Sequence, residues 1–192
     1  MTAVFSFSAG TRMARQVTRE RIMLGWREWA GLPRLGLSAV RCKIDSGARS
    51  SALHVDSCWR FTDRGAPWAG FCLSNDGHGE AMVQAVAPIF DEREVIDSGG
   101  HRTRRIFLRT PLVLAGIERE IEINLTDRQG MLFPMLLGRT AMAGVFTVDP
   151  ARSFLHGRRS GRNQEAVVRT DPGAQIPAYS RSRAPIPDSW PR

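Results

Sequence analysis

The stretch KIDSGARSSALH, residues 43–54, decides how the rest of the chain is interpreted. An apolar, β-like run, AVRCKI, leads directly into Asp45, and an apolar run resumes at Ala52. Asp-Ser-Gly triplets are common in tight turns, because Asp and Ser side chains bond to nearby backbone groups and Gly adopts turn conformations freely. Asp45 is therefore expected at the end of a strand, and the rest of the chain decides whether it does more than close a turn.

A second pattern, MLLGRTAMAG at residues 135–144, lies about 90 residues downstream. Two apolar residues precede Gly138 and Arg139, and the segment that follows has room for one short helix. Ala48 follows the glycine of the Asp-Ser-Gly triplet, and a small residue at that point lets another chain segment approach closely. The two patterns together give Asp45 a context that a simple turn lacks.

The body between the tails is read as short strands separated by turn residues. Residues 93–116 form two β-like arms around Asp97-Ser98-Gly99-Gly100, which predicts a hairpin. In REIEINLT the apolar residues alternate with Glu120, Glu122 and Asn124, as in a half-buried strand. Loops are expected in TDRGAPWAG, at residues 62–70, and in SNDGHGE, at residues 74–80. The prediction is an all-β sandwich or small barrel.

The basic charge belongs to the ends of the chain. The net charge is +8, yet residues 22–156 hold 16 Lys and Arg against 15 Asp and Glu. Residues 1–21 are read as a disordered basic lead-in, and residues 157–192 as a disordered tail rich in Arg, Pro and Ser. A body this close to neutral argues against a specific nucleic-acid-binding domain.

The composition indicates a reducing compartment and no membrane span. Three cysteines, Cys42, Cys58 and Cys72, show no paired spacing for a disulfide framework. No run of about 18 apolar residues occurs, and the first residues lack the pattern of a secretory signal, so a cytoplasmic location is expected. The usual zinc spacings, CxxC and HExxH, are absent. No metal site is predicted, since Cys42 fits a core residue and His54 a structural histidine.

Taken in order, LGWREWAGLP, KIDSGARSSALH, DEREV, GHR, LLGRTAMAG and VDPARSFL resemble the retropepsins, the single-domain aspartic proteases of retroviral type. More closely, the set is similar to the bacterial family often labelled ATP-dependent zinc proteases, and it covers residues 22–156. The resemblance implies a small closed acid-protease barrel with one short helix after the Gly-Arg motif. In that fold Leu136 and Leu137 thread behind the Asp loop, and Gly138 admits the crossing chain ahead of Arg139.

The resemblance implies an aspartic peptidase that works as a homodimer, with Asp45 of each subunit forming a catalytic dyad. Two carboxyl groups about 3 Å apart cannot both ionise, so they share one proton and can activate a water. Ser46 and Gly47 would support the loop. Substrate-binding positions would be Ala48, Arg49 and a hairpin tip, or flap, at Ser98, Gly99 and Gly100.

Arg49 departs from the family pattern. Retropepsins usually have an acid at this position, which pairs with the Arg of the Gly-Arg motif. Arg139 therefore needs another partner, and Asp91, Glu92 or a substrate carboxylate are the candidates. A substrate carboxylate as the partner of Arg139 would favour acidic substrates. Members of the family often occur beside ATP-grasp amino-acid ligases, and the resemblance therefore implies peptide-like or glutamylated substrates.

Two other functions remain open at this point. One is a zinc-dependent hydrolase on the same fold, as the family label suggests, with His54, His78, His101 or the cysteines as possible ligands. No cofactor is predicted from the residues themselves, because their spacing assembles no site. The other is a non-catalytic retropepsin-like module that binds extended peptides or dimerises.

Overall fold

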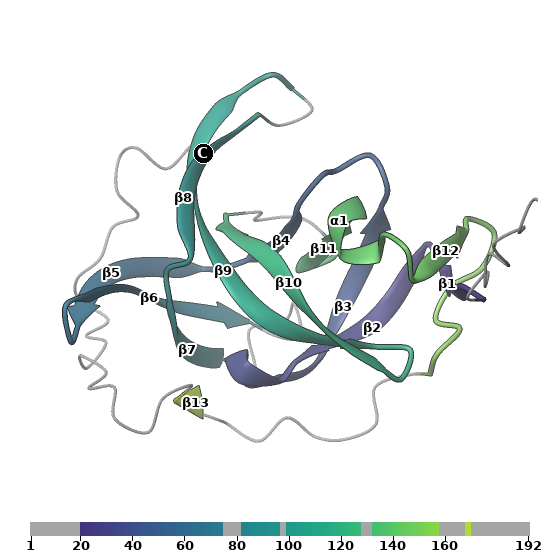
Figure 1. Ribbon diagram of the computed structural model, residues 1–192, viewed down its shortest axis with the longest axis horizontal. Helices are drawn as coiled ribbons and strands as arrows, with labels where there is room; N and C mark the ends of the chain where they lie inside the picture. Colours follow the sequence, from purple (N-terminus) through teal and green to yellow (C-terminus); the bar gives the residue numbers. More distant parts are fainter. Residues whose placement is uncertain (1–19, 75–81, 97–98, 128–131, 158–167, 170–192) are drawn as a thin grey trace, which may run out of the picture.

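The structure of the chain, a computed structural model shown in Figure 1, describes residues 20–74, 82–96, 99–127, 132–157 and 168–169. Strands dominate these residues, which confirms the all-β fold class. The strands are β1 (Ile22–Gly25), β2 (Arg27–Leu32), β3 (Leu37–Asp45), β4 (Ser51–His54), β5 (Ser57–Asp63), β6 (Ala66–Ser74), β7 (Met82–Pro88), β8 (Asp91–Ile96), β9 (Arg102–Leu114), β10 (Ile117–Thr126), β11 (Met135–Gly138), β12 (Phe146–Asp149) and β13 (Val168–Arg169). A 3-10 turn, η1 (Pro33–Leu35), and a short helix, α1 (Arg139–Met142), complete the described elements.

The largest sheet curls back on itself. Its strand order is β10-β4-β11-β3-β2-β9-β8, and β9 also pairs with β10 along most of their length. Because β9 contacts both β2 and β10, the order has the connectivity of a small barrel, with β8 extending from β9. The short helix expected after the Gly-Arg motif is α1, one turn long.

A second sheet, β13-β7-β6-β5, packs beside the barrel. In the β5–β6 hairpin, the loop expected at residues 62–70 is wrong, because all of these residues except Arg64 and Gly65 belong to β5 or β6. Of the loop expected at residues 74–80, residues 75–80 lie outside the described residues. The two-residue turn of the hairpin is Arg64-Gly65, both with positive φ (48° and 79°), which suits the twist of a tight hairpin. Outside residues 158–167 and 170–192, which the structure does not describe, the tail contributes only β13, paired parallel with β7.

The core lies between the curled sheet and the second sheet. It consists of aliphatic and aromatic side chains that are almost fully buried, among them Leu24, Leu53, Phe71, Leu108, Leu112, Ile123 and Leu137. In β10, Ile121, Ile123 and Leu125 are buried as the alternation predicts. Asn124 departs from the pattern, since it is only 2% exposed although the alternation places it on the solvent side.

A buried carboxylate ties the two ends of the body together. Glu28 is fully buried and accepts hydrogen bonds from the backbone N–H groups of Gly25 (2.8 Å), Leu155 (3.0 Å) and His156 (3.4 Å). The His156 side chain also bonds to the carbonyl of Met23 at 2.7 Å. This Glu28 clasp (Gly25, Glu28, Leu155, His156) holds the segment after β12 against the start of β2.

Two arms of the fold stand on the same side of the molecule. In Figure 1 the β8–β9 hairpin rises from the body, and the loop between β3 and β4 projects on the same side, next to α1. Their bounds place the hairpin tip and Asp45 in those two arms. No helix among the described residues is long and apolar enough to cross a membrane.

Candidate active site

Asp45 is the last residue of β3, and the loop that follows wraps around its carboxylate. Its Oδ1 accepts hydrogen bonds from the backbone N–H groups of Gly47 (3.1 Å) and Ala48 (3.0 Å). An Asp side chain that binds the backbone two and three residues later fixes a tight loop and its own rotamer. Asp45 is half-buried, while Ser46 and Gly47 are exposed.

Strand β11 passes directly behind this loop. It pairs in parallel with β3, with Leu136 opposite Lys43 and Gly138 opposite Asp45. On its other edge it pairs antiparallel with β4. A Cβ at position 138 would overlap the backbone carbonyl of Ser50, so only glycine fits between the loop and the crossing strand.

Hydrogen bonds from the start of α1 hold the far side of the loop. The N–H of Arg139 donates to the carbonyl of Ala48 (2.9 Å), and the N–H and hydroxyl of Thr140 donate to the carbonyl of Arg49 (3.2 and 2.9 Å). The N–H of Gly138 donates to the Ser51 hydroxyl at 3.2 Å. Thr140 and Ser51 were missed by sequence reasoning, since their partners lie about 90 residues away.

The structure leaves two arginines exposed beside the loop. Arg49 lies on it, and Arg139 follows Gly138 at its back. Neither side chain makes an ion pair with another described residue. Two of the three candidates for the Arg139 partner bind other arginines instead: Asp91 pairs with Arg93 (3.1 Å), and Glu92 pairs with Arg60 (2.8 Å) and Arg104 (3.3 Å). The third candidate, a substrate carboxylate, stays a prediction.

The hairpin tip is only partly described. Gly99 and Gly100 are exposed, and Gly100 has a positive φ of 84°. Ser98, the third predicted tip residue, lies outside the described residues. Ile96, at the end of β8, is 57% exposed, so the described part of the tip presents both an apolar side chain and glycine backbone.

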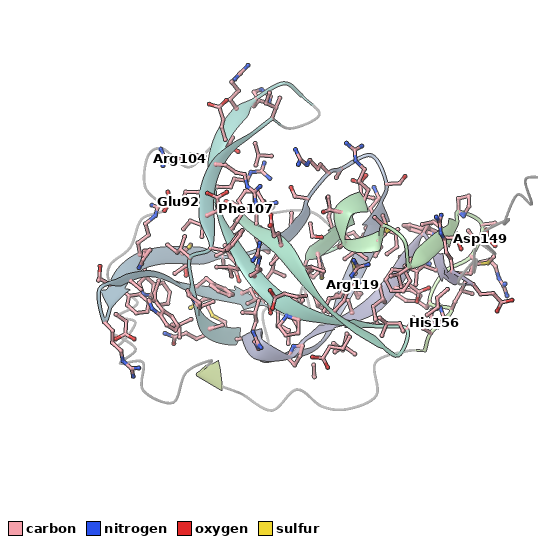
Figure 2. All side chains as sticks on the ribbon, viewed as in Figure 1. Glu92, Arg104, Phe107, Arg119, Asp149 and His156 are labelled. Atoms are coloured by element: carbon pink, nitrogen blue, oxygen red, sulfur yellow. The ribbon has the colours of Figure 1, made fainter. Side chains whose placement is uncertain are left out.

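Ion pairs brace the two arms of the hairpin. The Glu92–Arg104 pair joins β8 to β9, and Figure 2 labels both side chains on the hairpin. On the strand next to β9, Glu122 accepts hydrogen bonds from Arg93 and Arg109, and its hydrogen bond with Arg93 holds the pKa of the Glu122 carboxyl below its usual value. The charged DEREV segment is therefore a salt-bridged edge strand.

Of the side chains considered as zinc ligands, His78 lies outside the described residues and His101 is exposed beside Gly100. Burial raises the pKa of all three cysteine thiols, that of Cys58 to about 12, and the thiolate is the form that binds metals. His54 pairs with Asp56 at 3.2 Å, in keeping with a structural histidine. No group of three or more His, Cys, Asp or Glu that could hold a metal occurs within the part of the chain that the structure describes.

Comparisons with known proteins extend over most of the chain. Residues 23–159 match the RimB-like family, described as retropepsin-like aspartic endopeptidase RimB. Two curated proteins named probable alpha-L-glutamate ligase are similar: one from Shewanella pealeana, 33% identical over 148 residues (77% of this chain, 32% of the relative), and one from Parasynechococcus marenigrum, 38% identical over 140 residues (71% and 30%). The chain thus spans about a third of the length of these relatives.

Among solved structures, a Legionella pneumophila protein of unknown function is similar, with a TM-score of 0.61 and 25% sequence identity. The match covers 72% of this chain and 100% of that protein. The family model matches more than half of the residues. The β-rich fold, the loop around Asp45 and the crossing of β11 at Gly138 are observed in the structure of the same segment. The chain therefore belongs to the RimB-like family of retropepsin-like aspartic endopeptidases.

Proposed function

We propose that this chain is an aspartic peptidase whose dyad forms from Asp45 of two subunits in a homodimer. The observation that carries the proposal is the geometry at the end of β3, where Gly47 and Ala48 hold Oδ1 of Asp45 and Gly138 lies opposite it in register. Those bonds occupy one carboxylate oxygen and leave the other to face a second carboxyl. One chain supplies one such loop, so a two-fold axis is needed to complete the site.

The chemistry needs both carboxyls and one water. The ionised Asp45 takes a proton from the water as its oxygen attacks the peptide carbonyl carbon, and the protonated Asp45 donates its proton to the carbonyl oxygen. The carboxyl that took the water proton then donates it to the nitrogen while the other takes a proton from a hydroxyl of the tetrahedral intermediate, so the C–N bond breaks, the amine and the acid leave, and the dyad again holds one proton. Ser46, exposed next to Asp45, would hydrogen-bond across the dimer and hold the two loops together.

We infer that the substrates carry carboxylates. Arg49 and Arg139 are exposed beside the loop, and guanidinium groups bind carboxylates in a two-pronged geometry. Relatives over this segment are named probable alpha-L-glutamate ligases, which supports a peptide-like substrate containing glutamate. Backbone groups at Ala48 and at the tip glycines, Gly99 and Gly100, would bind the extended substrate chain, with the tip closing over it.

The test compares the wild-type chain with Asp45→Asn on a degenerate peptide library that includes glutamate-rich and glutamylated members. Cleavage that is strong in the wild type at mildly acidic or neutral pH and lost in Asp45→Asn supports the proposal. Cleavage that survives Asp45→Asn would contradict it.

Two added arms of the same assay address the other functions. Loss of cleavage on adding a chelator, restored by zinc, would favour a metal-dependent hydrolase on this fold. Binding of peptides by both the wild type and Asp45→Asn, with no cleavage by either, would favour a non-catalytic module.

A further inference from the structure

A line of hydrogen bonds connects the hairpin to the Asp45 loop along the face of β10 opposite the core residues Ile121, Ile123 and Leu125. It begins at Arg105, which is half-buried on β9, the second arm of the hairpin. Arg105 Nε donates to the hydroxyl of Thr103 at 2.8 Å, and Nη1 donates to Oδ1 of Asn124 at 3.1 Å. These bonds fix the guanidinium against β10.

Asn124 is the central member of this line. It is 2% exposed, and its Nδ2 donates to the carbonyl oxygen of Ser51 at 2.6 Å, so the acceptor and the donor of the amide are both used. A buried amide satisfied at both ends constrains the two groups that it joins, because breaking either bond leaves a polar atom without a partner away from water.

Ser51 carries the line to the residues around Asp45. It begins β4, directly after the loop, and is fully buried. Its hydroxyl accepts the N–H of Gly138 at 3.2 Å, and Gly138 lies in register with Asp45. Through Arg105, Asn124 and Ser51, the hairpin arm is therefore connected to the strand immediately beside the candidate catalytic carboxyl.

We propose that Asn124 is a positioning residue that fixes the hairpin arm relative to the Asp45 loop, so that both bind substrate in one arrangement. The amide touches no substrate itself. The carboxylate of Asp45 keeps its own bonds to Gly47 and Ala48, which do not involve Asn124. Loss of Asn124 is thus expected to weaken substrate binding more than the chemical step. The kinetic part rests on the proposed peptidase function, whereas the structural coupling does not.

The kinetic experiment compares Asn124→Leu with Glu118→Gln as a matched control on the same face of β10. Glu118 is exposed and belongs neither to the hairpin ion pairs nor to the line of hydrogen bonds through Asn124. Asn124→Leu should raise KM about tenfold and change kcat by less than about twofold, because uniform binding is lost while the catalytic loop is retained. Glu118→Gln should leave both constants near those of the wild type. Equal effects in the two variants, or an unchanged KM in a folded Asn124→Leu protein, would overturn the proposal.

A second measurement is independent of activity. Amide hydrogen exchange, followed by NMR, should be at least about tenfold faster at Gly138 in Asn124→Leu, with Gly25 of the Glu28 clasp unchanged as an internal reference. Arg105→Leu, a change at a half-buried position where folding is less at risk, should show the same selective effect. Unchanged exchange at Gly138 in both variants, or equal acceleration at Gly25, would count against the coupling. If the wild type cleaves no peptide, the proposed function fails, while this exchange experiment still decides the role of Asn124.

Discussion

At the scale of single residues, the site depends on two positions where side-chain size or charge is decisive. Gly138 has no room for a Cβ, because Ser50 of the loop lies against it. Arg49 places a cation where the related aspartic proteases usually have an acid. The first position concerns how the loop is built, and the second concerns what we propose that it binds.

Gly138→Ala should destabilise the fold and remove activity together. The added methyl group would force β11 away from Ser50, and overpacking against rigid backbone costs about 3 kcal/mol or more. Urea denaturation measures the loss. Thr140→Ala, which removes one hydroxyl bond to Arg49 in the same region, is the control and should cost about 1 kcal/mol. A Gly138→Ala protein as stable as the wild type would show that the crossing is looser than described.

Arg49→Ala should reduce kcat/KM about tenfold on glutamate-rich peptides and leave neutral peptides unaffected, because one charge-assisted contact is lost. Arg34→Ala, at an exposed arginine in η1, serves as the control for net charge. Identical losses on acidic and neutral peptides would speak against recognition of substrate carboxylates by Arg49.

At the scale of elements, sequence patterns predicted local structure well and long-range contacts poorly. The hairpin around residues 97–100, the alternation of β10 and the short helix at 139–142 are local patterns, and each appears. In the β5–β6 hairpin, residues 62–70 were expected to form a loop, whereas only Arg64-Gly65 forms the turn and strand pairing continues on both sides of it. Buried polar residues were missed for a different reason: Asn124 bonds to Ser51, 73 positions away.

The Glu28 clasp is the clearest of these missed features. In sequence Glu28 follows Arg27 in an otherwise apolar run, and its partners Leu155 and His156 lie 127 and 128 positions away. Glu28→Ala should destabilise the protein by about 3 kcal/mol or more, since it leaves buried N–H groups unpaired. Glu118→Ala, at an exposed position on β10, should have almost no effect. Thermal unfolding of the two variants tests this, and equal stability would contradict the role of the clasp.

The hydrogen bonds of Glu122 with Arg93 and Arg109 make the stability of the protein depend on pH in a defined direction. The pKa of the Glu122 carboxyl is lowered from its ordinary value of 4.5 by the hydrogen bond from Arg93. Its stabilising contribution is therefore fully present above the unfolded value and is lost as pH falls through the lowered folded value. Glu122→Gln should be less stable than the wild type at about pH 7, and the difference should shrink at about pH 3. A difference that is constant across this range would contradict the ion-pair account.

At the scale of the whole molecule, the barrel brings together patterns that are far apart in the chain. The Asp-Ser-Gly loop was recognisable in sequence as a turn, and the crossing of the Leu-Leu-Gly-Arg run behind it was expected from the resemblance to the retropepsins. The register that places Gly138 opposite Asp45 is seen only in the structure. The ion pairs of Asp91 and Glu92 with Arg60, Arg93 and Arg104 also required the structure, because each joins side chains on paired or neighbouring strands or along one strand in a way that the sequence does not reveal.

The central claim is that two chains each contribute Asp45 to one site, and mixing wild-type and Asp45→Asn chains tests it most directly. The two chains are refolded together at a constant total concentration, and peptide cleavage is measured against the wild-type fraction. If each site needs both carboxyls, only wild-type homodimers are active, so activity follows the square of that fraction and an equal mixture retains about a quarter. A linear decline, with about half of the activity retained in an equal mixture, would mean that each chain carries a complete site and would contradict the account.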